Sequence, residues 1–291
     1  MNEKELITQE KYVIAGCKWQ AKRKAELTSN ILNYSFEAKR LLRKMENNKL
    51  IINKIIKSPI LFDFIIGATM LSQKSLQHFS ESELKRYIKS NINFDRINEQ
   101  NYLNELERYY LMSAGESIGG KIRNIIGKKG NDIFINYIKE YLESNNITYS
   151  VIEKNDNVQK IYTNDLVILF NKKPNFIGKS VDFMVLKKYQ DGSYDIEDHN
   201  QYISAGELKS GIDPAGADEH WKTAATALKR IHQGFIKKGI DSPNIFFIGG
   251  AISKHMASEI IYNIENNKLK YAANLNYKKQ MENIVEHLLN G

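Results

Sequence analysis

The sequence predicts an α/β protein in which a mixed sheet with flanking helices follows a mainly helical N-terminal part. Helix-length segments rich in Leu, Ile, Lys and Glu fill roughly the first hundred residues. Short β-branched runs begin near Asn146, and a long amphipathic segment follows Ala217. We expect residues 1–111 to form the helical region and residues 112–291 the α/β domain, with the two parts packed as one body.

Each element follows from a local pattern. In the N-terminal part, residues 26–47 and 82–91 have the length and composition of helices. The later β-branched runs predict strands at residues 147–152, 166–170, 181–186, 202–208 and 244–248. The polar, turn-rich segment 189–201 predicts a hairpin between the two strands that it joins. After Ala217, apolar residues recur at three- and four-residue steps, which predicts a helix packed against the sheet.

Composition and charge narrow the possible functions. The 291 residues suffice for one large domain or two modest ones. A formal charge of +8 makes a polyanion such as nucleic acid the expected macromolecular partner. The single cysteine, Cys17, excludes an intrachain disulfide framework. Residues 1–6 do not resemble a secretory signal, and the longest apolar run, residues 59–71, is too short to span a bilayer. We therefore expect a cytoplasmic protein without a membrane partner.

Two acids and a lysine stand in a pattern typical of metal-dependent nucleases. Asp182 lies in the expected strand 181–186, and Glu207 and Lys209 are two positions apart on the next one. Because alternate residues of a strand share a face, neighbouring strands would gather two carboxylates and an ammonium at one point. The carboxylates suit Mg²⁺, and the lysine would position or help deprotonate a water. The alternative for Asp182 is a turn or salt-bridge acid, but an unpaired carboxylate is costly in an apolar strand.

The surroundings of Glu207 carry a more specific signal than the tripeptide Glu-Leu-Lys, which recurs at residues 83–85 in a segment expected to be helical. Residues 206–224 read Gly-Glu-Leu-Lys-Ser-Gly-Ile-Asp-Pro-Ala-Gly-Ala-Asp-Glu-His-Trp-Lys-Thr-Ala. This segment closely resembles the catalytic segment of type II restriction endonucleases of the AvaI and BsoBI type, and the Lys-Ser-Val-Asp-Phe around Asp182 fits the same pattern. Val181 departs from the wider superfamily, in which proline often precedes the first acid.

The resemblance covers about residues 112–250 and implies a restriction-endonuclease-like core, a central mixed sheet flanked by helices. It implies Mg²⁺-dependent hydrolysis of both strands of a short palindromic duplex DNA site by a homodimer, leaving 5′-phosphate ends. The catalytic residues would be Asp182, Glu207, Lys209 and His220, with the metal held by Asp182, Glu207 and the backbone carbonyl of Leu208. A cognate DNA methyltransferase is the expected partner in the same system.

Two residues of this segment keep an alternative. His220 stands where the resembled family has a histidine near the scissile phosphate, and would act as a base or orient water. Its alternative is an exposed helix residue beside Trp221. Asp213 precedes Pro214, a combination that often opens a helix or a turn. Alternatively, Asp213 contacts DNA by accepting a hydrogen bond from the N4 amino group of a cytosine.

The glycine-rich segment 115–130 suggests a different function, because residues 115–121 match the first half of a phosphate-binding loop. Ile122 stands where that loop needs Ser or Thr, and the preceding residues look helical, so an NTPase is disfavoured. We interpret the segment as a DNA-facing loop and helix that contacts phosphates. The expected contacts come from Lys121, Arg123, Asn124, Lys128 and Lys129.

Two alternative functions remain open at this point. One is a nuclease with the same core that works in DNA repair or nicks DNA. The other is a noncatalytic DNA-binding protein, which the combination of Asp182, Glu207 and Lys209 disfavours.

Overall fold

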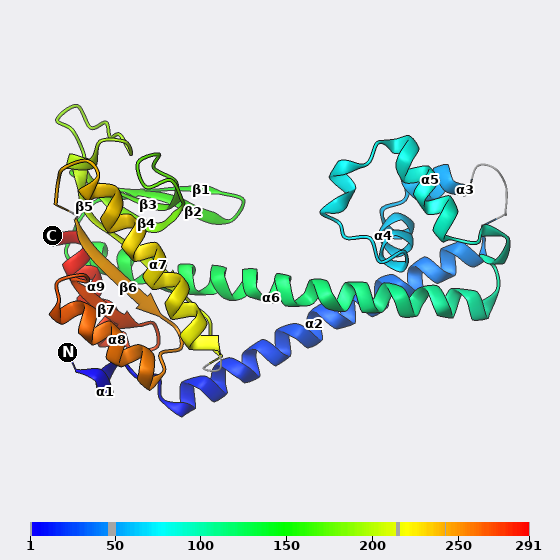
Figure 1. The fold of residues 1–291 in the computed structure, drawn as a ribbon, viewed down its shortest axis with the longest axis horizontal. Helices are drawn as coiled ribbons and strands as arrows, with labels where there is room; N and C mark the ends of the chain where they lie inside the picture. Colours follow the sequence, from blue (N-terminus) through cyan, green and yellow to red (C-terminus); the bar gives the residue numbers. More distant parts are fainter. Residues whose placement is uncertain (1, 46–50, 214–215, 242, 291) are drawn as a thin grey trace. The chain divides into compact units, whose positions relative to one another are not determined.

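The computed structural model describes residues 2–45, 51–213, 216–241 and 243–290 (Figure 1). The chain forms two compact units, and the expectation that they pack as one body stays a prediction. The helical unit comprises Trp19–Arg123, and the sheet unit comprises Met1–Lys18 with Asn124–Gly291. The expected division between residues 111 and 112 lies within helix α6 (Gln100–Ser144), and as a domain boundary it stays a prediction.

The helical unit is built around one apolar core. Besides parts of α2 (Glu10–Arg43) and α6, it contains α3 (Ile51–Lys57), α4 (Pro59–Ala68), α5 (Glu81–Asn91) and the short 3₁₀ helices η1 (Ser75–His78) and η2 (Phe94–Arg96). Ser58 and Ser80 are the N-caps of α4 and α5, since each side chain accepts a hydrogen bond from a backbone N–H of the first turn. A largely buried ion pair between Lys39 and Glu107 joins α2 to α6.

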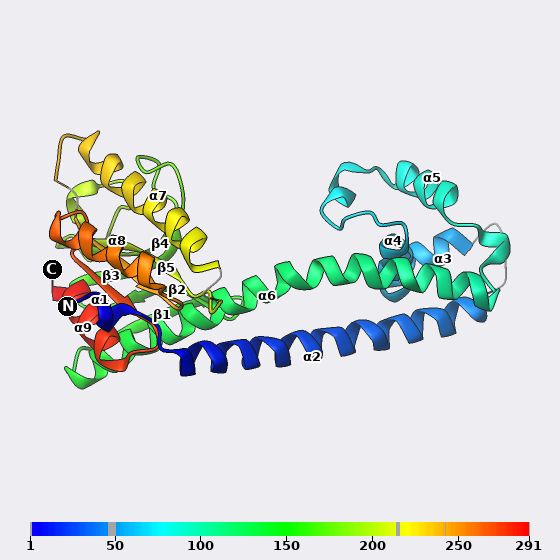
Figure 2. The same ribbon diagram turned by 60° about the horizontal axis from the view of Figure 1, so that its bottom comes forward.

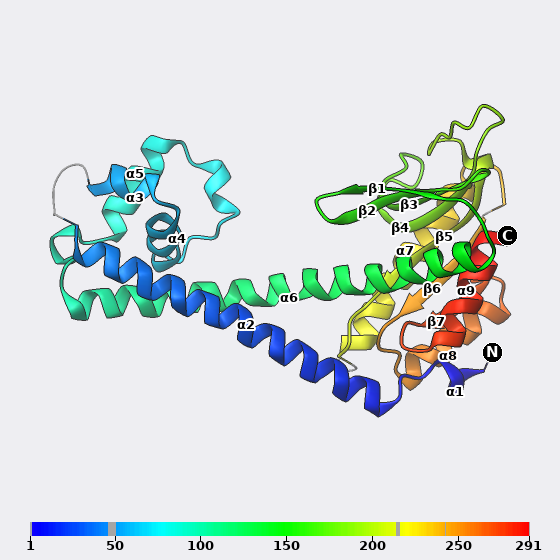
Figure 3. The ribbon, with the colours of Figure 1, turned by 180° about the vertical axis from the view of Figure 1, so that it is seen from behind.

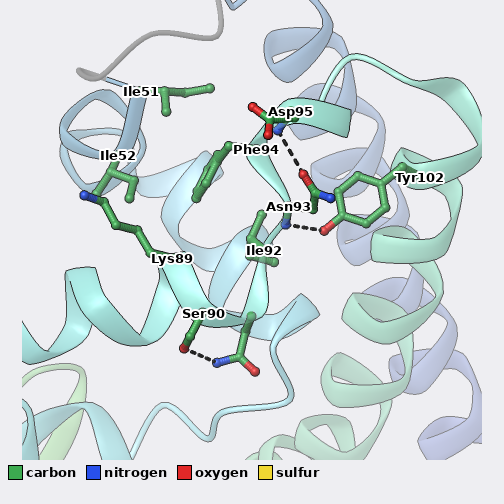
Figure 4. Close-up of a pocket in the computed structure, with 10 residues that line it drawn as sticks. Ile51, Ile52, Lys89, Ser90, Ile92, Asn93, Phe94, Asp95 and Tyr102 are labelled. Atoms are coloured by element: carbon green, nitrogen blue, oxygen red, sulfur yellow. Dashed lines mark hydrogen bonds between the residues drawn. The ribbon is translucent and has the colours of Figure 1, made fainter.

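An open groove of about 1020 Å³ lies in the helical unit, beside α3 and α5 (Figure 4). Its polar groups are largely paired with one another: the Asn93 N–H donates to the Tyr102 hydroxyl at 2.7 Å, and the Asp95 N–H donates to the Asn93 side chain at 3.0 Å. The groove contains none of the expected catalytic residues, all of which belong to the sheet unit.

The sheet unit holds a seven-stranded sheet whose strands lie in sequence order. These are β1 (Ser150–Lys154), β2 (Asn157–Tyr162), β3 (Leu166–Lys172), β4 (Val181–Lys187), β5 (Tyr202–Lys209), β6 (Asn244–Gly249) and β7 (Tyr271–Asn274), with the 3₁₀ helix η3 (His199–Gln201) before β5. Strands β1 to β5 pair antiparallel, whereas β6 and β7 continue the sheet parallel to β5. The parallel strands require crossovers, which are α7 (Ala217–Ile236) and α8 (Lys254–Glu265).

Helices cover both faces of this sheet (Figures 1 and 3). One apolar cluster joins the sheet to α7, α8 and the short N-terminal helix α1 (Glu3–Leu6). A second cluster joins the opposite face to the later part of α6 and to α9 (Lys278–Asn290). The expected α/β fold with a mixed sheet between helices is confirmed.

The N-terminal segment belongs to the sheet unit, next to α8 and α9 (Figure 2). The Thr8 N–H donates to the Ile252 carbonyl at 3.0 Å, and the Ile252 N–H donates to the Thr8 hydroxyl at 2.8 Å. The fully buried Asn274 donates to the Leu6 carbonyl at 2.9 Å. Backbone groups of residues 6–8 are thus bonded to the loop after β6 and to the end of β7.

The hairpin expected between residues 181–186 and 202–208 is confirmed as β4 and β5, and the helix expected after Ala217 is confirmed as α7. Strands β2 and β7 were not predicted, because β2 mixes polar with apolar residues and β7 has only 4 residues. The prediction of a loop within residues 115–130 is wrong, because α6 runs through this segment. Each interior glycine costs a helix about 1 kcal/mol relative to alanine. Burial of apolar residues between and after the glycines, such as Ile122 and Phe134, offsets this cost.

Candidate active site

Asp182, Glu207 and Lys209 meet at one end of the β4–β5 pair. Phe183 pairs with Gly206, so extending the register by one position places Asp182 opposite Glu207. The Lys209 ammonium donates to Glu207 Oε2 at 2.7 Å and to Asp182 Oδ2 at 3.1 Å. The structure therefore brings together the two carboxylates and the ammonium that the strand pattern predicts.

The glycine before Glu207 is needed for close packing of the neighbouring strands. A Cβ atom added to Gly206 would lie 2.3 Å from Cζ of Phe183 and 2.4 Å from the carbonyl oxygen of Phe246. The Phe183 ring in turn packs on Phe134 of α6, with ring centroids 4.9 Å apart. The β5 backbone is thus confined between β4 and β6 directly before Glu207.

The electrostatics of the cluster follow from its burial. Glu207 is 3% exposed and neighbours Phe247 on β6. Burial, and then the negative charge of Asp182, raise the pKa of Glu207 to about 7. Burial alone would lower the pKa of Lys209, but Asp182 and Glu207 raise it above its usual value. Lys209 is therefore an ammonium at neutral pH, and when both acids ionise it balances only one of their two charges.

The oxygen donors of the cluster suit a hard divalent cation. The N–H of Leu208 donates to Asp182 Oδ2 at 2.9 Å. Because the N–H and C=O of one strand residue point the same way, the Leu208 carbonyl also faces the Asp182 side. Within the described ranges, no group of three or more His, Cys, Asp or Glu side chains could hold a metal ion. Two carboxylates and one carbonyl match Mg²⁺, which usually keeps several waters.

His220 lies in the first turn of α7, and its side chain is exposed. Its ring rests against the backbone that follows Lys209, because a Cβ atom added to Gly211 would lie 2.7 Å from His220 Nε2. In the described part of the chain, the hydrogen-bond partners of the Lys209 ammonium are Asp182 and Glu207, not His220. The structure thus places the imidazole against the backbone at Gly211, two residues after Lys209, and the described hydrogen bonds of the three charged groups do not include it.

Asp213 is exposed in the segment between β5 and α7. The N-cap of α7 is Gly216, so Asp213 does not cap α7 itself. The Gly216 N–H donates to the Asp213 carbonyl at 3.2 Å, a hydrogen bond of the kind that closes a turn. Pro214 lies outside the described residues, and a base contact by Asp213 stays a prediction.

The expected phosphate-contacting residues are all exposed on α6. Lys121 and Arg123 belong to the helical unit, whereas Asn124, Lys128 and Lys129 belong to the sheet unit. The Lys128 ammonium donates to the Asp156 carbonyl in the β1–β2 turn and lies 3.5 Å from Asp132. Lys128 would exchange these partners on binding a phosphate. Because α6 is continuous here, the match to a phosphate-binding loop does not correspond to a loop.

A contact with no clear sequence signal joins α6 to the end of β5. Ser210 follows Lys209 and is 8% exposed, and its hydroxyl donates to the Ile126 carbonyl at 3.0 Å. A Cβ atom added to Gly130 of α6 would lie only 2.2 Å from Cβ of Ser210. Strand alternation places Ser210 on the face of Leu208, but the glycines around residue 130 predicted a chain break rather than the helix that covers this face.

Comparisons with known proteins identify the family of this chain. The sequence pattern of the family described as Restriction endonuclease BsobI matches residues 2–169 and 163–290. The chain is 32% identical over 257 residues to the type II restriction enzyme BsoBI of Geobacillus stearothermophilus, and the match covers 78% of each chain. It is 31% identical over 242 residues to the type II restriction enzyme AvaI of Nostoc sp., covering 76% of each chain. AvaI of Anabaena variabilis matches equally well. From matches of this extent, we conclude that the chain belongs to the BsoBI family of type II restriction endonucleases.

Proposed function

We propose that this chain is a Mg²⁺-dependent, site-specific endonuclease. It hydrolyses a phosphodiester bond in each strand of a short palindromic duplex site and leaves 5′-phosphate ends. Membership of the family supports DNA as the substrate. The observation that carries the proposal is the convergence of Asp182 and Glu207 on the ammonium of Lys209, at 3.1 and 2.7 Å.

Asp182, Glu207 and the Leu208 carbonyl would hold the metal. When bound there, Mg²⁺ neutralises charge on the scissile phosphate and lowers the pKa of a water. Burial of Glu207 and the nearby charge of Asp182 raise the pKa of Glu207, because both disfavour a second negative charge in the cluster. A bound divalent cation would offset the repulsion between the two carboxylates and favour their ionised forms.

Lys209 would act on the attacking water or on the phosphate. An ammonium has three N–H donors, and two of them are used by Glu207 and Asp182. The third is available to orient a water or to donate to a developing oxyanion. Because hydrogen bonds to both carboxylates already hold the Lys209 ammonium, its position is set before DNA binds.

His220 would orient the water or accept its proton. The ring lies over Gly211, two residues after Lys209, and is exposed, so a phosphate arriving from solvent can meet it. An imidazole is the side chain most often used for proton transfer near neutral pH.

The remaining features support a duplex DNA partner. A net charge of +8 favours a polyanionic partner. The exposed cations of α6 would contact phosphates on both strands of the duplex. A homodimer suits a two-fold symmetric site, because each subunit supplies one catalytic cluster. None of the described helices is long and apolar enough to cross a membrane. We propose that the protein works in the cytoplasm with a cognate DNA methyltransferase.

Incubation of the purified protein with plasmid and Mg²⁺ tests the proposal. We expect discrete double-strand fragments, one palindrome in run-off sequencing of their ends, and ends that a ligase rejoins without prior phosphorylation. Nicked or smeared plasmid would indicate a repair or nicking nuclease with the same core. Plasmid that is bound in Ca²⁺ but never cut in Mg²⁺ would indicate a noncatalytic DNA-binding protein.

A further inference from the structure

The backbone at Lys209 is held from two sides within the sheet unit. From one side, the Gly250 N–H after β6 donates to the Lys209 carbonyl at 2.7 Å. A Cβ atom added to Gly250 would lie 3.0 Å from the Ser210 carbonyl oxygen, so the two segments are in close contact. From the other side, the Ser210 hydroxyl reaches the Ile126 carbonyl of α6.

The contact between Ser210 and α6 leaves no room for a side chain at residue 130. A Cβ atom added to Gly130 would lie 2.2 Å from Ser210 Cβ and 3.3 Å from Leu208 Cδ2. In an α-helix the carbonyl of residue 126 also accepts the N–H of residue 130, so the Ser210 hydroxyl and Gly130 share one acceptor. Because Ser210 is buried, little water is available to replace this hydrogen bond.

We propose that Ser210 is a positioning residue for Lys209. This inference rests on the proposed function, in which the Lys209 ammonium acts at the scissile phosphate. Successive side chains of a strand point to opposite faces, so anchoring Ser210 on the α6 side directs Lys209 toward Asp182 and Glu207. The hydroxyl of Ser210 touches neither of these acids and acts only through the backbone that it shares with Lys209.

The same contact ties the catalytic strand to a helix that is expected to bind DNA. Lys128 and Lys129 lie between Ile126 and Gly130, in the turn of α6 that meets Ser210. A phosphate held by this turn would therefore have a defined position relative to the Lys209 ammonium. Ser210 thus links the turn of α6 that would hold a phosphate to the strand that carries Lys209.

The test compares Ser210→Ala with Ser204→Ala. Ser204 is a matched control, because it lies on β5, is fully buried, and donates to a helix carbonyl, that of Leu288 in α9, also at 3.0 Å. Both variants lose one buried hydrogen bond of the same kind and should show comparable falls in melting temperature. Only Ser210→Ala should slow single-turnover cleavage at saturating enzyme and Mg²⁺, by about 10- to 100-fold, the scale expected when a catalytic group is displaced by a fraction of an ångström to one ångström.

The affinity for the cut site in Ca²⁺ should stay within about twofold of wild type for both variants, since neither serine is placed at the DNA interface. Equal cleavage rates for Ser210→Ala and Ser204→Ala would overturn the positioning role. Recovery of the Ser210→Ala rate when Mg²⁺ is raised above the concentration that saturates the wild type would also overturn it, because the defect would then lie in metal affinity. A wild-type protein that cuts no DNA would refute the proposed function and this inference together, whereas cutting by wild type with an unslowed Ser210→Ala refutes only the inference.

Discussion

Glu207 and Lys209 depend on each other because they share a face of one strand, where Glu207 is buried and Lys209 is half-buried. Without the ammonium, the adjacent carboxylates of Asp182 and Glu207 would repel each other, and without the carboxylates the half-buried ammonium would lose both of its partners. His220 is different, since it is exposed and the expected catalytic groups do not bond its ring. Its role is therefore open to a test by substitution that leaves the cluster intact.

We expect His220→Ala to slow single-turnover cleavage by about 10²-fold or more, the usual scale for general acid–base catalysis. DNA affinity should change little. His255→Ala is the matched control, because His255 is also exposed on a helix of the sheet unit and lies 3.6 Å from Glu259. The measurement is the cleavage rate from pH 6 to 9. If His220→Ala and His255→Ala both cut at the wild-type rate, His220 is a surface helix residue.

At the scale of elements, α6 is unusual because it stays helical through many glycines. Four of them, Gly115, Gly119, Gly120 and Gly127, have open space where a Cβ atom would lie. Gly130 is the exception, because α6 approaches Ser210 too closely there for any side chain. Glycines in one helix thus differ in whether packing requires them.

This difference predicts opposite effects on stability. Gly127→Ala should raise the free energy of unfolding by up to about 1 kcal/mol, because alanine is the better helix former and meets no neighbour. Gly130→Ala should lower it by roughly 1–3 kcal/mol, the usual cost of overpacking, because its Cβ atom would overlap with Ser210. Urea unfolding of the two variants and the wild type measures both. Equal destabilisation by the two substitutions would contradict the packing described at Gly130.

The cations of α6 supply a prediction about DNA binding. If Lys129 contacts a phosphate, Lys129→Ala should weaken specific and nonspecific binding alike and reduce the slope of log K against log salt by about 0.9. If Asp213 contacts a base, Asp213→Ala should change sequence preference and leave the slope nearly intact. Binding isotherms at several salt concentrations distinguish the two residues. A wild-type slope for Lys129→Ala would remove this residue from the DNA interface.

Elements with a clear local pattern could be predicted from the sequence, and those shaped by distant contacts could not. The β4–β5 hairpin has two short apolar runs joined by a turn-rich segment, and α7 has a helical stripe, so their boundaries were predicted to within a few residues. Strand β7 has only 4 residues, too few for a periodic signal. The helicity of residues 115–130 depends on packing before and after the glycines, which a local pattern does not contain.

The same distinction applies to the candidate site. Asp182, Glu207 and Lys209 could be predicted to converge because strand geometry alone brings them together. The anchoring of Ser210 could not, because it needs the α6 backbone to pass within hydrogen-bond distance of a residue 84 positions away.

At the scale of the whole molecule, the chain combines a helical unit and a sheet unit in one basic protein. The expected catalytic residues all lie in the sheet unit, whereas the expected phosphate contacts lie in both units. Loss of catalysis and loss of DNA binding should therefore be separable by substitution. Residues in the carboxylate–lysine cluster should affect only the first.

The most direct test of this account is single-turnover cleavage of a cut-site duplex by Glu207→Ala, with Glu83→Ala as control. Glu83 belongs to a second Glu-Leu-Lys tripeptide, at the start of α5 in the helical unit, so the two variants remove the same residue from the same local sequence. We expect Glu207→Ala to cut at least about 10³-fold more slowly, since a lost metal ligand removes several kcal/mol of transition-state stabilisation. It should still bind the site in Ca²⁺, and Glu83→Ala should cut at the wild-type rate. Cleavage by Glu207→Ala at near the wild-type rate would contradict the assignment of this cluster as the active site.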